Sequence, residues 1–347
     1  MARFQVREQR FGSHPVTILS DPVTAAGAAI AHRGATLLSF TILHEGRLVA
    51  LLDGFATPEE LEHPQGARSW IMAPFSNRIA DGSYRFRGAS HQLEITQPKS
   101  RTAIHGLIRT EPFERIRTEE TEEFSSATFS CKAIRAGRFP GYPFDVDVRV
   151  RFMLGERSLS MEIAGENVGS RPAPFGCGWH PYFKTSESGI DHLPLAIPAQ
   201  GVIRVDDRLL PLDGQAAFRT LAEAPDVDFR PSRPTASRRL GNRVLDCCFY
   251  GLSTDADGLS RTSLTDPDTG LTLTVFQEGG LMHVFTGDTL PIRPRASIAL
   301  EPVQYMTNAF NRPETRERIV LPPGETSVFR FGVEAGGPVS AQEAGGR

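Results

Sequence analysis

Three polar residues in separate segments of this chain could move protons at neutral pH. They are His105, His180 and Glu301. An imidazole titrates close to neutrality, and a carboxyl group in an apolar setting can become a base of similar strength. Two imidazoles and one carboxylate are therefore enough for general acid–base catalysis.

Each of these residues also has a plain structural interpretation. Pro181 favours an extended backbone at His180, and a histidine among aromatic side chains is more often a hydrogen-bonded core residue. Gly106 permits close approach of backbone or ligand beside His105, so a simple loop histidine is equally plausible. Glu301 follows three apolar residues, and a buried carboxylate there must be paired or have a raised pKa. Either state suits a general base, although a purely structural carboxylate also fits.

Two further side chains could bind a sugar. Arg78 offers a rigid fork of donors for hydroxyl groups, and Asp246 offers acceptors. Arg78 could equally pair with a carboxylate, and Asp246 could cap a turn. The sequence contains no phosphate-binding glycine loop, no Gly-x-Ser-x-Gly elbow and no His-Glu-x-x-His helix.

Bulk composition narrows the class of protein. The net charge is −3, so nucleic acid and anionic membranes are not expected partners. No apolar run approaches a membrane span, and the N-terminus lacks the apolar stretch of a signal peptide. Four cysteines without a CxxC pair predict neither a disulfide framework nor a zinc knuckle. We therefore expect a cytoplasmic protein.

The polar residues are carried by segments that predict strands. Apolar residues alternate with polar ones over 146–154 and again over 159–163, separated by a Gly-Glu-Arg turn. Another strand is expected over 328–333, whereas helical periodicity is almost confined to one turn over 58–62. The 32 Gly and 26 Pro residues also indicate frequent turns. The sequence predicts an all-β fold of antiparallel strands in packed sheets, with one domain over 1–333 and a disordered tail over 334–347.

Seven short segments, taken in order, resemble the aldose 1-epimerase (galactose mutarotase-like) family over nearly the whole chain. The most specific is Trp179-His180-Pro181-Tyr182-Phe183. The others are Asn77-Arg78-Ile79, Ile104-His105-Gly106, Gly141-Tyr142-Pro143, Leu245-Asp246 with Phe249, Glu301-Pro302 with Asn308-Ala309-Phe310-Asn311, and Leu321-Pro322-Pro323-Gly324-Glu325.

The resemblance implies a large antiparallel β-sandwich with a sugar cleft across one sheet, and interconversion of the α and β anomers of a free aldose. It implies that Glu301 is the general base, that His180 is the general acid, and that His105 binds and polarises near the reacting oxygens. Arg78 and Asp246 would hold the distal hydroxyls. Because only protons move, no metal or organic cofactor is expected, and the protein would act as a monomer or homodimer.

Two alternatives remain at this stage. A hexose-phosphate 1-epimerase on the same fold would need a basic cluster, for which Arg78 and Arg109 are candidates. A sugar-binding or sensing protein would keep the cleft without the activity, although pure binding needs no matched acid and base. The chain departs from the family pattern at Cys247, at Cys248 and after Glu301, positions that bear on which sugar is bound.

Overall fold

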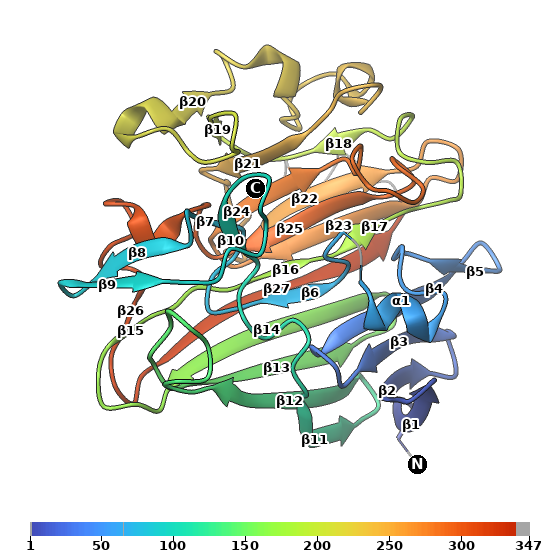
Figure 1. Ribbon diagram of the computed structural model, residues 1–347. Coiled ribbons are helices and arrows are strands. Elements are labelled where there is room, and N and C mark those ends of the chain that lie inside the picture. Colours follow the sequence, from blue (N-terminus) through green and yellow to red (C-terminus); the bar gives the residue numbers. More distant parts are fainter. Residues whose placement is uncertain (1, 65, 338–347) are drawn as a thin grey trace.

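In the computed structural model, which describes residues 2–64 and 66–337, strands are grouped into three larger antiparallel sheets (Figure 1). Sheet 1 follows chain order, with strands β1 (Gln5–Phe11), β2 (His14–Asp21), β3 (Ala26–Ala31), β4 (Thr36–His44) and β5 (Arg47–Ala50). Sheet 2 has the order β11 (Glu114–Glu120), β12 (Ser125–Ile134), β13 (Val146–Leu154), β14 (Ser158–Asn167), β27 (Thr326–Gly336), β23 (Thr272–Gln277), β22 (Ser260–Thr265) and β18 (Leu195–Ala196).

Sheet 3 carries three of the five predicted site residues, which are His180, Asp246 and Glu301. Its order is β20 (Phe218–Thr220), β19 (Gly201–Ile203), β21 (Asp246–Tyr250), β24 (Leu281–Phe285), β25 (Ile298–Val303), β16 (Gly178–His180) and β6 (Trp70–Met72), and β17 (Tyr182–Phe183) also pairs with β25. Three small ladders complete the strands: β7 (Arg78–Ala80) with β10 (Thr102–Ile104), β8 (Ser83–Phe86) with β9 (Ala89–Gln92), and β15 (Ala173–Pro174) with β26 (Val320–Leu321).

Helical structure is limited to short turns in the described residues. The one α-helix is α1 (Pro58–Glu62), whose N-cap Thr57 accepts a hydrogen bond from the backbone N–H of Glu60. The 3₁₀ turns are η1 (Gly214–Ala217), η2 (Pro225–Val227), η3 (Thr235–Arg238) and η4 (Ala309–Asn311). The all-β prediction is confirmed, because period-two alternation dominates the chain.

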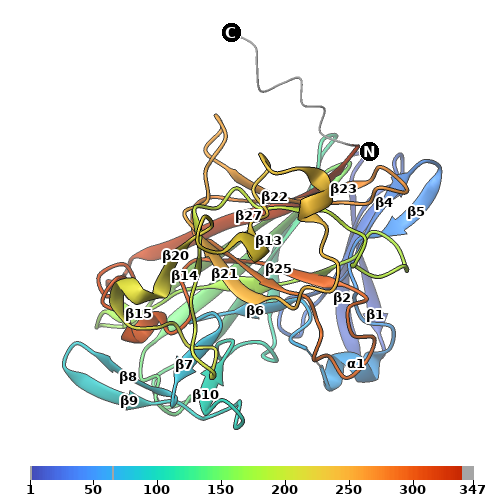
Figure 2. The same ribbon diagram turned by 90° about the horizontal axis from the view of Figure 1, so that it is seen from above.

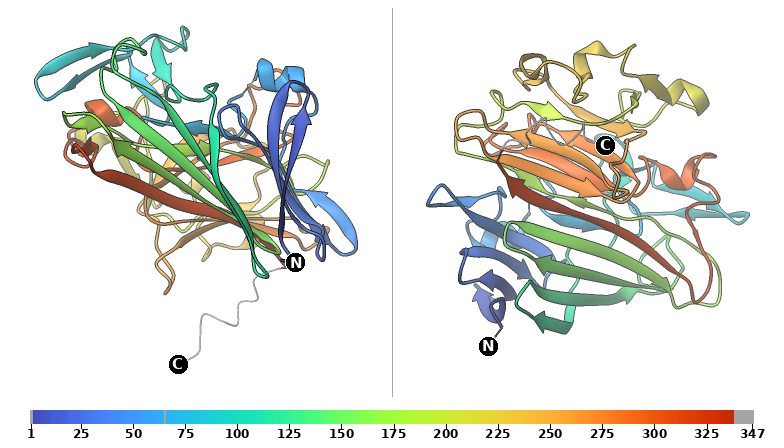
Figure 3. Two further views of the ribbon diagram at one scale, coloured as in Figure 1. Left: turned by 90° about the horizontal axis from the view of Figure 1, so that it is seen from below. Right: turned by 180° about the vertical axis from the view of Figure 1, so that it is seen from behind.

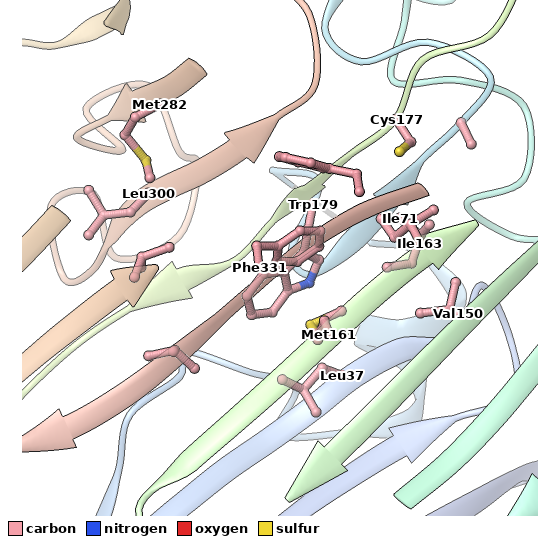
Figure 4. Close-up of a cluster of buried hydrophobic side chains, with 14 of the residues drawn as sticks. Leu37, Ile71, Val150, Met161, Ile163, Cys177, Trp179, Met282, Leu300 and Phe331 are labelled. Atoms are coloured by element: carbon pink, nitrogen blue, oxygen red, sulfur yellow. The ribbon is translucent and has the colours of Figure 1, made fainter. Parts of the chain in front are cut away.

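Sheets 2 and 3 pack face to face around the main core. The Trp179 ring of β16 stacks on the Phe331 ring of β27, with centroids 5.8 Å apart and an interplanar angle of 20°. Figure 4 shows this pair surrounded by side chains of both sheets and of sheet 1, among them Leu37, Ile71, Val150, Met161, Ile163, Met282 and Leu300. Such a dry interface is the expected solution for strands with one apolar face.

Sheet 1 lies against the β12–β13 end of sheet 2 (Figure 3). The hairpins around β7, β10, β8 and β9 lie on the other side of sheet 3, away from sheet 2 (Figure 2). Sheet 3 is therefore covered on both faces, on one by the core and on the other by loops and small ladders.

Strand β13 shows the predicted alternation, with every second side chain buried from Val146 to Leu154. The last strand differs from the prediction at its end. It continues to Gly336, three residues past the expected domain boundary at 333, because Ala335 is buried and pairs with Leu273. The expected tail over 334–347 thus begins inside the sheet, and its residues 338–347 lie outside the described part of the chain.

Candidate active site

Strand register sets a row of polar side chains across one face of sheet 3. Register partners point to the same side of a sheet, and Cys248, His283 and Glu301 are partners on the adjacent strands β21, β24 and β25. His180 lies two residues beyond Gly178, the partner of Val303, so it also faces this side. Their sequence neighbours on the strands point into the core instead.

All five predicted site residues line one cleft on this face. Its volume is about 810 Å³, and its wall includes Arg78, His105, His180, Asp246 and Glu301. A cleft of this size accommodates a sugar. The structure therefore brings together residues from five separate segments of the chain, while their roles stay predictions.

His105 is positioned by a strained turn. Its φ is +59°, an uncommon value for a residue with a side chain, and its N–H donates to the Asn77 carbonyl over 3.0 Å. Gly106 follows with φ +71°, and a Cβ there would lie 2.2 Å from the Ala73 carbonyl oxygen. Only glycine fits this close approach, which keeps the His105 turn next to β6 of the sheet. Nδ1 of His105 lies 2.9 Å from Sδ of Met72.

Arg78 is held by a segment more than two hundred residues away. Asn308 donates its N–H to the Arg78 carbonyl over 2.8 Å, and its Oδ1 accepts from Ala80 N–H over 3.0 Å. The guanidinium donates to Asn77 Oδ1 over 2.9 Å and lies 3.6 Å from Asp246 Oδ2. The Asn308 segment, noted in the sequence as a family motif, therefore positions the arginine.

Glu301 and His180 form a buried pair. Glu301 Oε1 lies 3.3 Å from His180 Nε2, and the two side chains are only 1% and 6% exposed. Glu301 Oε2 and His180 Nδ1 have no hydrogen-bond partner among the described residues. Because buried polar atoms normally find partners, this pair has capacity for a polar ligand in the cleft.

Burial sets the protonation of this pair. Loss of solvent raises the pKa of the Glu301 carboxyl to about 7, although the charges of His283 and Arg78 oppose the shift. Burial, and next the charge of His283, lowers the pKa of His180 to about 3. The order of these pKa values leaves the pair with a single proton near neutral pH, which Glu301 holds more strongly than His180. A protonated His180 in the resting pair, which the role of general acid requires, is therefore not favoured by these pKa values.

Burial also affects the pKa values of His105 and Asp246. Burial and the neighbouring His180 and Arg78 hold the pKa of His105 well below its ordinary value, so this imidazole is neutral. Burial is the largest single influence on the pKa of Asp246 and raises it. The hydrogen bond and charge of His283, together with the charges of Arg78 and His180, outweigh burial, so the net shift is downward. Asp246 is thus an ionised acceptor in the cleft.

His283 is a site residue that the sequence interpretation missed. It lies in an apolar strand, is 6% exposed, and its Nε2 is 2.9 Å from Asp246 Oδ1. Although burial disfavours its charge, the carboxylates of Glu301 and Asp246 raise the pKa of His283 well above its ordinary range. The available signal was a lone histidine in the run Leu-Met-His-Val-Phe, which indicates a polar residue on a buried strand.

Aromatic rings wall the cleft. Tyr182 stacks on His180 with centroids 5.1 Å apart, and the rings of His105 and His180 meet edge to face at the same distance. Trp70 contacts the His105 ring on one side, and the Arg109 guanidinium lies 4.8 Å from the Trp70 ring. These rings restrict water and fix both imidazoles.

A sequence model of the family described as Aldose 1-epimerase matches residues 17–333. The chain belongs to the aldose 1-epimerase family. The resemblance noted in the sequence is thereby confirmed.

Two proteins of Escherichia coli are similar to this chain in sequence. The chain is 29% identical over 255 residues to the uncharacterized protein YihR of Escherichia coli, covering 73% of this chain and 74% of that protein. It is 25% identical over 312 residues to the aldose 1-epimerase of the same organism, covering 84% of this chain and 87% of the relative.

Solved structures of the aldose 1-epimerase family share the fold. A galactose mutarotase-like protein from Clostridium acetobutylicum superposes with a TM-score of 0.80 at 14% identity, covering 96% of this chain and 99% of that chain. Galactose 1-epimerase from Lactobacillus acidophilus superposes with a TM-score of 0.78 at 16% identity, covering 97% and 100%. In the described part of this family member, no helix is long and apolar enough to cross a membrane.

Proposed function

We propose that this protein is an aldose 1-epimerase that interconverts the α and β anomers of a free sugar. The observation that carries the proposal is the contact of 3.3 Å between the Glu301 carboxyl and the His180 imidazole inside the cleft. The pair holds one proton at neutral pH and offers both a proton acceptor and a proton donor to one bound ring.

Only protons need to move in this reaction. In the reactive form the single proton of the pair lies on His180, and Glu301 is ionised. Glu301 then takes the proton from the anomeric hydroxyl, the bond between C1 and the ring oxygen breaks, and His180 gives its proton to that oxygen. The open-chain aldehyde rotates about its C1–C2 bond. Closure on the other face of C1 returns one proton from the ring hydroxyl to His180 and one from Glu301 to the new anomeric oxygen.

The remaining residues hold the ring during these steps. His105, neutral and pressed against the sheet, can donate to or accept from an oxygen near C1. Arg78 and Asp246 offer donors and acceptors to the distal hydroxyls, which supports their proposed role in binding. Orientation of this kind lowers the barrier further, because the reacting atoms no longer search for one another.

A sugar that carries an anionic group is a second candidate substrate. Arg109 lines the cleft, and its side-chain donors contact only the carbonyl oxygens of Ile104 and Gly106, at 3.3 and 3.4 Å. Among the described residues no carboxylate lies within ion-pair distance of Arg109 or of the cleft residue Lys99. Arg78, by contrast, is already engaged by Asp246.

The decisive experiment follows the anomeric equilibrium of freshly dissolved aldoses and sugar phosphates by polarimetry, with and without the protein. Acceleration for a neutral aldose supports the proposal, and acceleration confined to phosphates supports the second candidate. Binding of a sugar by calorimetry with no acceleration for any substrate would contradict both and indicate a sugar sensor.

A further inference from the structure

His283 occupies the centre of the polar row on sheet 3. Its strand β24 lies between β21 and β25, and its register partners are Cys248 on one side and Glu301 on the other. The side chain is 7% exposed and forms part of the cleft wall.

The surroundings of His283 favour a charged ring. Nε2 donates to Asp246 Oδ1 over 2.9 Å, and a hydrogen bond to the Cys248 side chain also favours the protonated form. Asp246 in turn faces the Arg78 guanidinium at 3.6 Å with its other oxygen. An imidazole that donates to a partly buried carboxylate is held in one orientation, because rotation of the ring would leave its Nε2–H without this partner.

The charged groups that face His283 balance one another. Asp246 and Cys248 come from β21, Glu301 from β25, His180 from β16 and Arg78 from β7. The cleft therefore contains two carboxylates and one guanidinium. Its three imidazoles are those of His283, His180 and His105. A second positive charge is needed when Glu301 is ionised, and His283 is the imidazole with a carboxylate already bound to it.

We infer that His283 is a positioning residue for the proposed epimerisation: an imidazolium, anchored by Asp246, that presents a fixed positive charge to the Glu301–His180 pair. This inference rests on the proposed function for its consequence in catalysis. The charge of His283 makes the pair release its last proton at lower pH than the pair would alone, because a nearby cation favours the carboxylate.

The test uses His283→Gln in the full-length protein, since the glutamine amide can still donate to Asp246 but carries no charge. The titration of Glu301 is followed by ¹³C NMR in protein labelled at the glutamate carboxyl carbon, and Glu301→Gln assigns the signal. We expect the midpoint in His283→Gln to rise by about one pH unit. The alkaline limb of kcat/KM should move by the same amount, with KM within about threefold of the wild type.

Two controls separate charge from structure. His283→Lys restores a cation and should return the midpoint toward that of the wild type. His91→Gln removes an imidazole of the same kind on β9, where it stacks on Tyr84 and lines no part of the cleft, and should move nothing.

An unchanged midpoint in a folded His283→Gln variant would overturn the inference even if epimerase activity is present. If no sugar is epimerised, the proposed function fails, while a shifted NMR midpoint still supports the fixed charge. Should His283→Gln not fold, ¹⁵N NMR of the wild-type imidazoles decides the matter. Two protonated ring nitrogens on one histidine at pH 8, lost in Asp246→Asn, support the inference, and nine neutral histidines overturn it.

Discussion

The two faces of sheet 3 are built from alternate residues of the same strands and differ completely in chemistry. On the core face, Trp179 and Leu300 are fully buried against sheet 2. On the cleft face, their neighbours His180 and Glu301 are almost equally buried, at 5% and 1% exposed. An ordinary two-layer sandwich would place polar residues of the second face in water.

Burial alone does not make a face reactive, because both faces are almost equally buried; the cleft face is reactive because its buried side chains are ionisable. A carboxylate in water keeps a low pKa, whereas Glu301 is desolvated by the loops and small ladders over sheet 3 and its pKa rises to about 7. Burying such groups costs free energy that an apolar pair would not. The core face contributes stability, and the cleft face gives up stability for proton transfer. Four predictions probe that division.

The largest effect should come from Glu301→Gln. The substitution keeps size and hydrogen bonding but removes the base, so the epimerisation rate should fall by about 10²–10⁴-fold. The melting temperature should not drop, because a buried ionisable group has been replaced by a neutral one. Rates by polarimetry and sugar affinity by calorimetry are measured together, and near-normal turnover would remove Glu301 from the base role.

A substitution of Leu300, which precedes Glu301 and points into the core, should affect stability and not catalysis. Leu300→Ala opens a cavity in the core, so the free energy of unfolding should decrease by about 2–5 kcal/mol. The pH profile of kcat/KM for the protein that stays folded should be unchanged. Denaturant unfolding measures the first quantity, and a rate profile that shifts with Leu300→Ala would show that the two faces are not independent.

Substitutions of His180 and His105 should differ in their effects on affinity and turnover. His180→Asn retains a donor but cannot deliver a proton, so turnover should fall about 10²-fold with little change in affinity. His105→Asn should weaken both affinity and turnover, because its proposed role is to hold oxygens near C1. If the two variants show the same ratio of effects on KM and kcat, the division of roles is wrong.

The smallest effect concerns pH in the wild type. The productive pair carries one proton, and that proton is lost as pH rises through about 7. We expect kcat/KM to be level on the acid side and to fall about tenfold for each pH unit above the midpoint. A profile that instead rises from pH 6 to pH 8 would mean that the free carboxylate with a neutral His180 is the active form.

Much of the fold follows from local sequence. Alternation over 146–154 predicts β13 and its buried side chains, and the turn that follows it predicts the hairpin with β14. The end of β27 could not be predicted in the same way. Ala335 and Gly336 have little strand propensity. They join the sheet because β23 pairs with both residues and the carbonyl of Arg157, just before β14, accepts from the Ala335 N–H.

The candidate site was also predictable only in part from the sequence. Arg78, His105, His180, Asp246 and Glu301 stand in recognisable motifs, and the structure gathers them in one cleft. His283 stands in no recognisable motif. Its place in the site depends on the pairing of β24 with β21 and β25, which brings it beside Asp246 and Glu301.

By itself, the sequence determined the strand period, the family and the five residues of the motifs, because these depend on neighbours along the chain. The order of proton affinities, with Glu301 above His180, was decided only by the tertiary structure. So were the pairing of His283 with Asp246 and the place of His283 beside Glu301. The physical reason is that register joins strands far apart in sequence, and that a pKa in a closed cleft responds to burial and charges supplied by many segments at once.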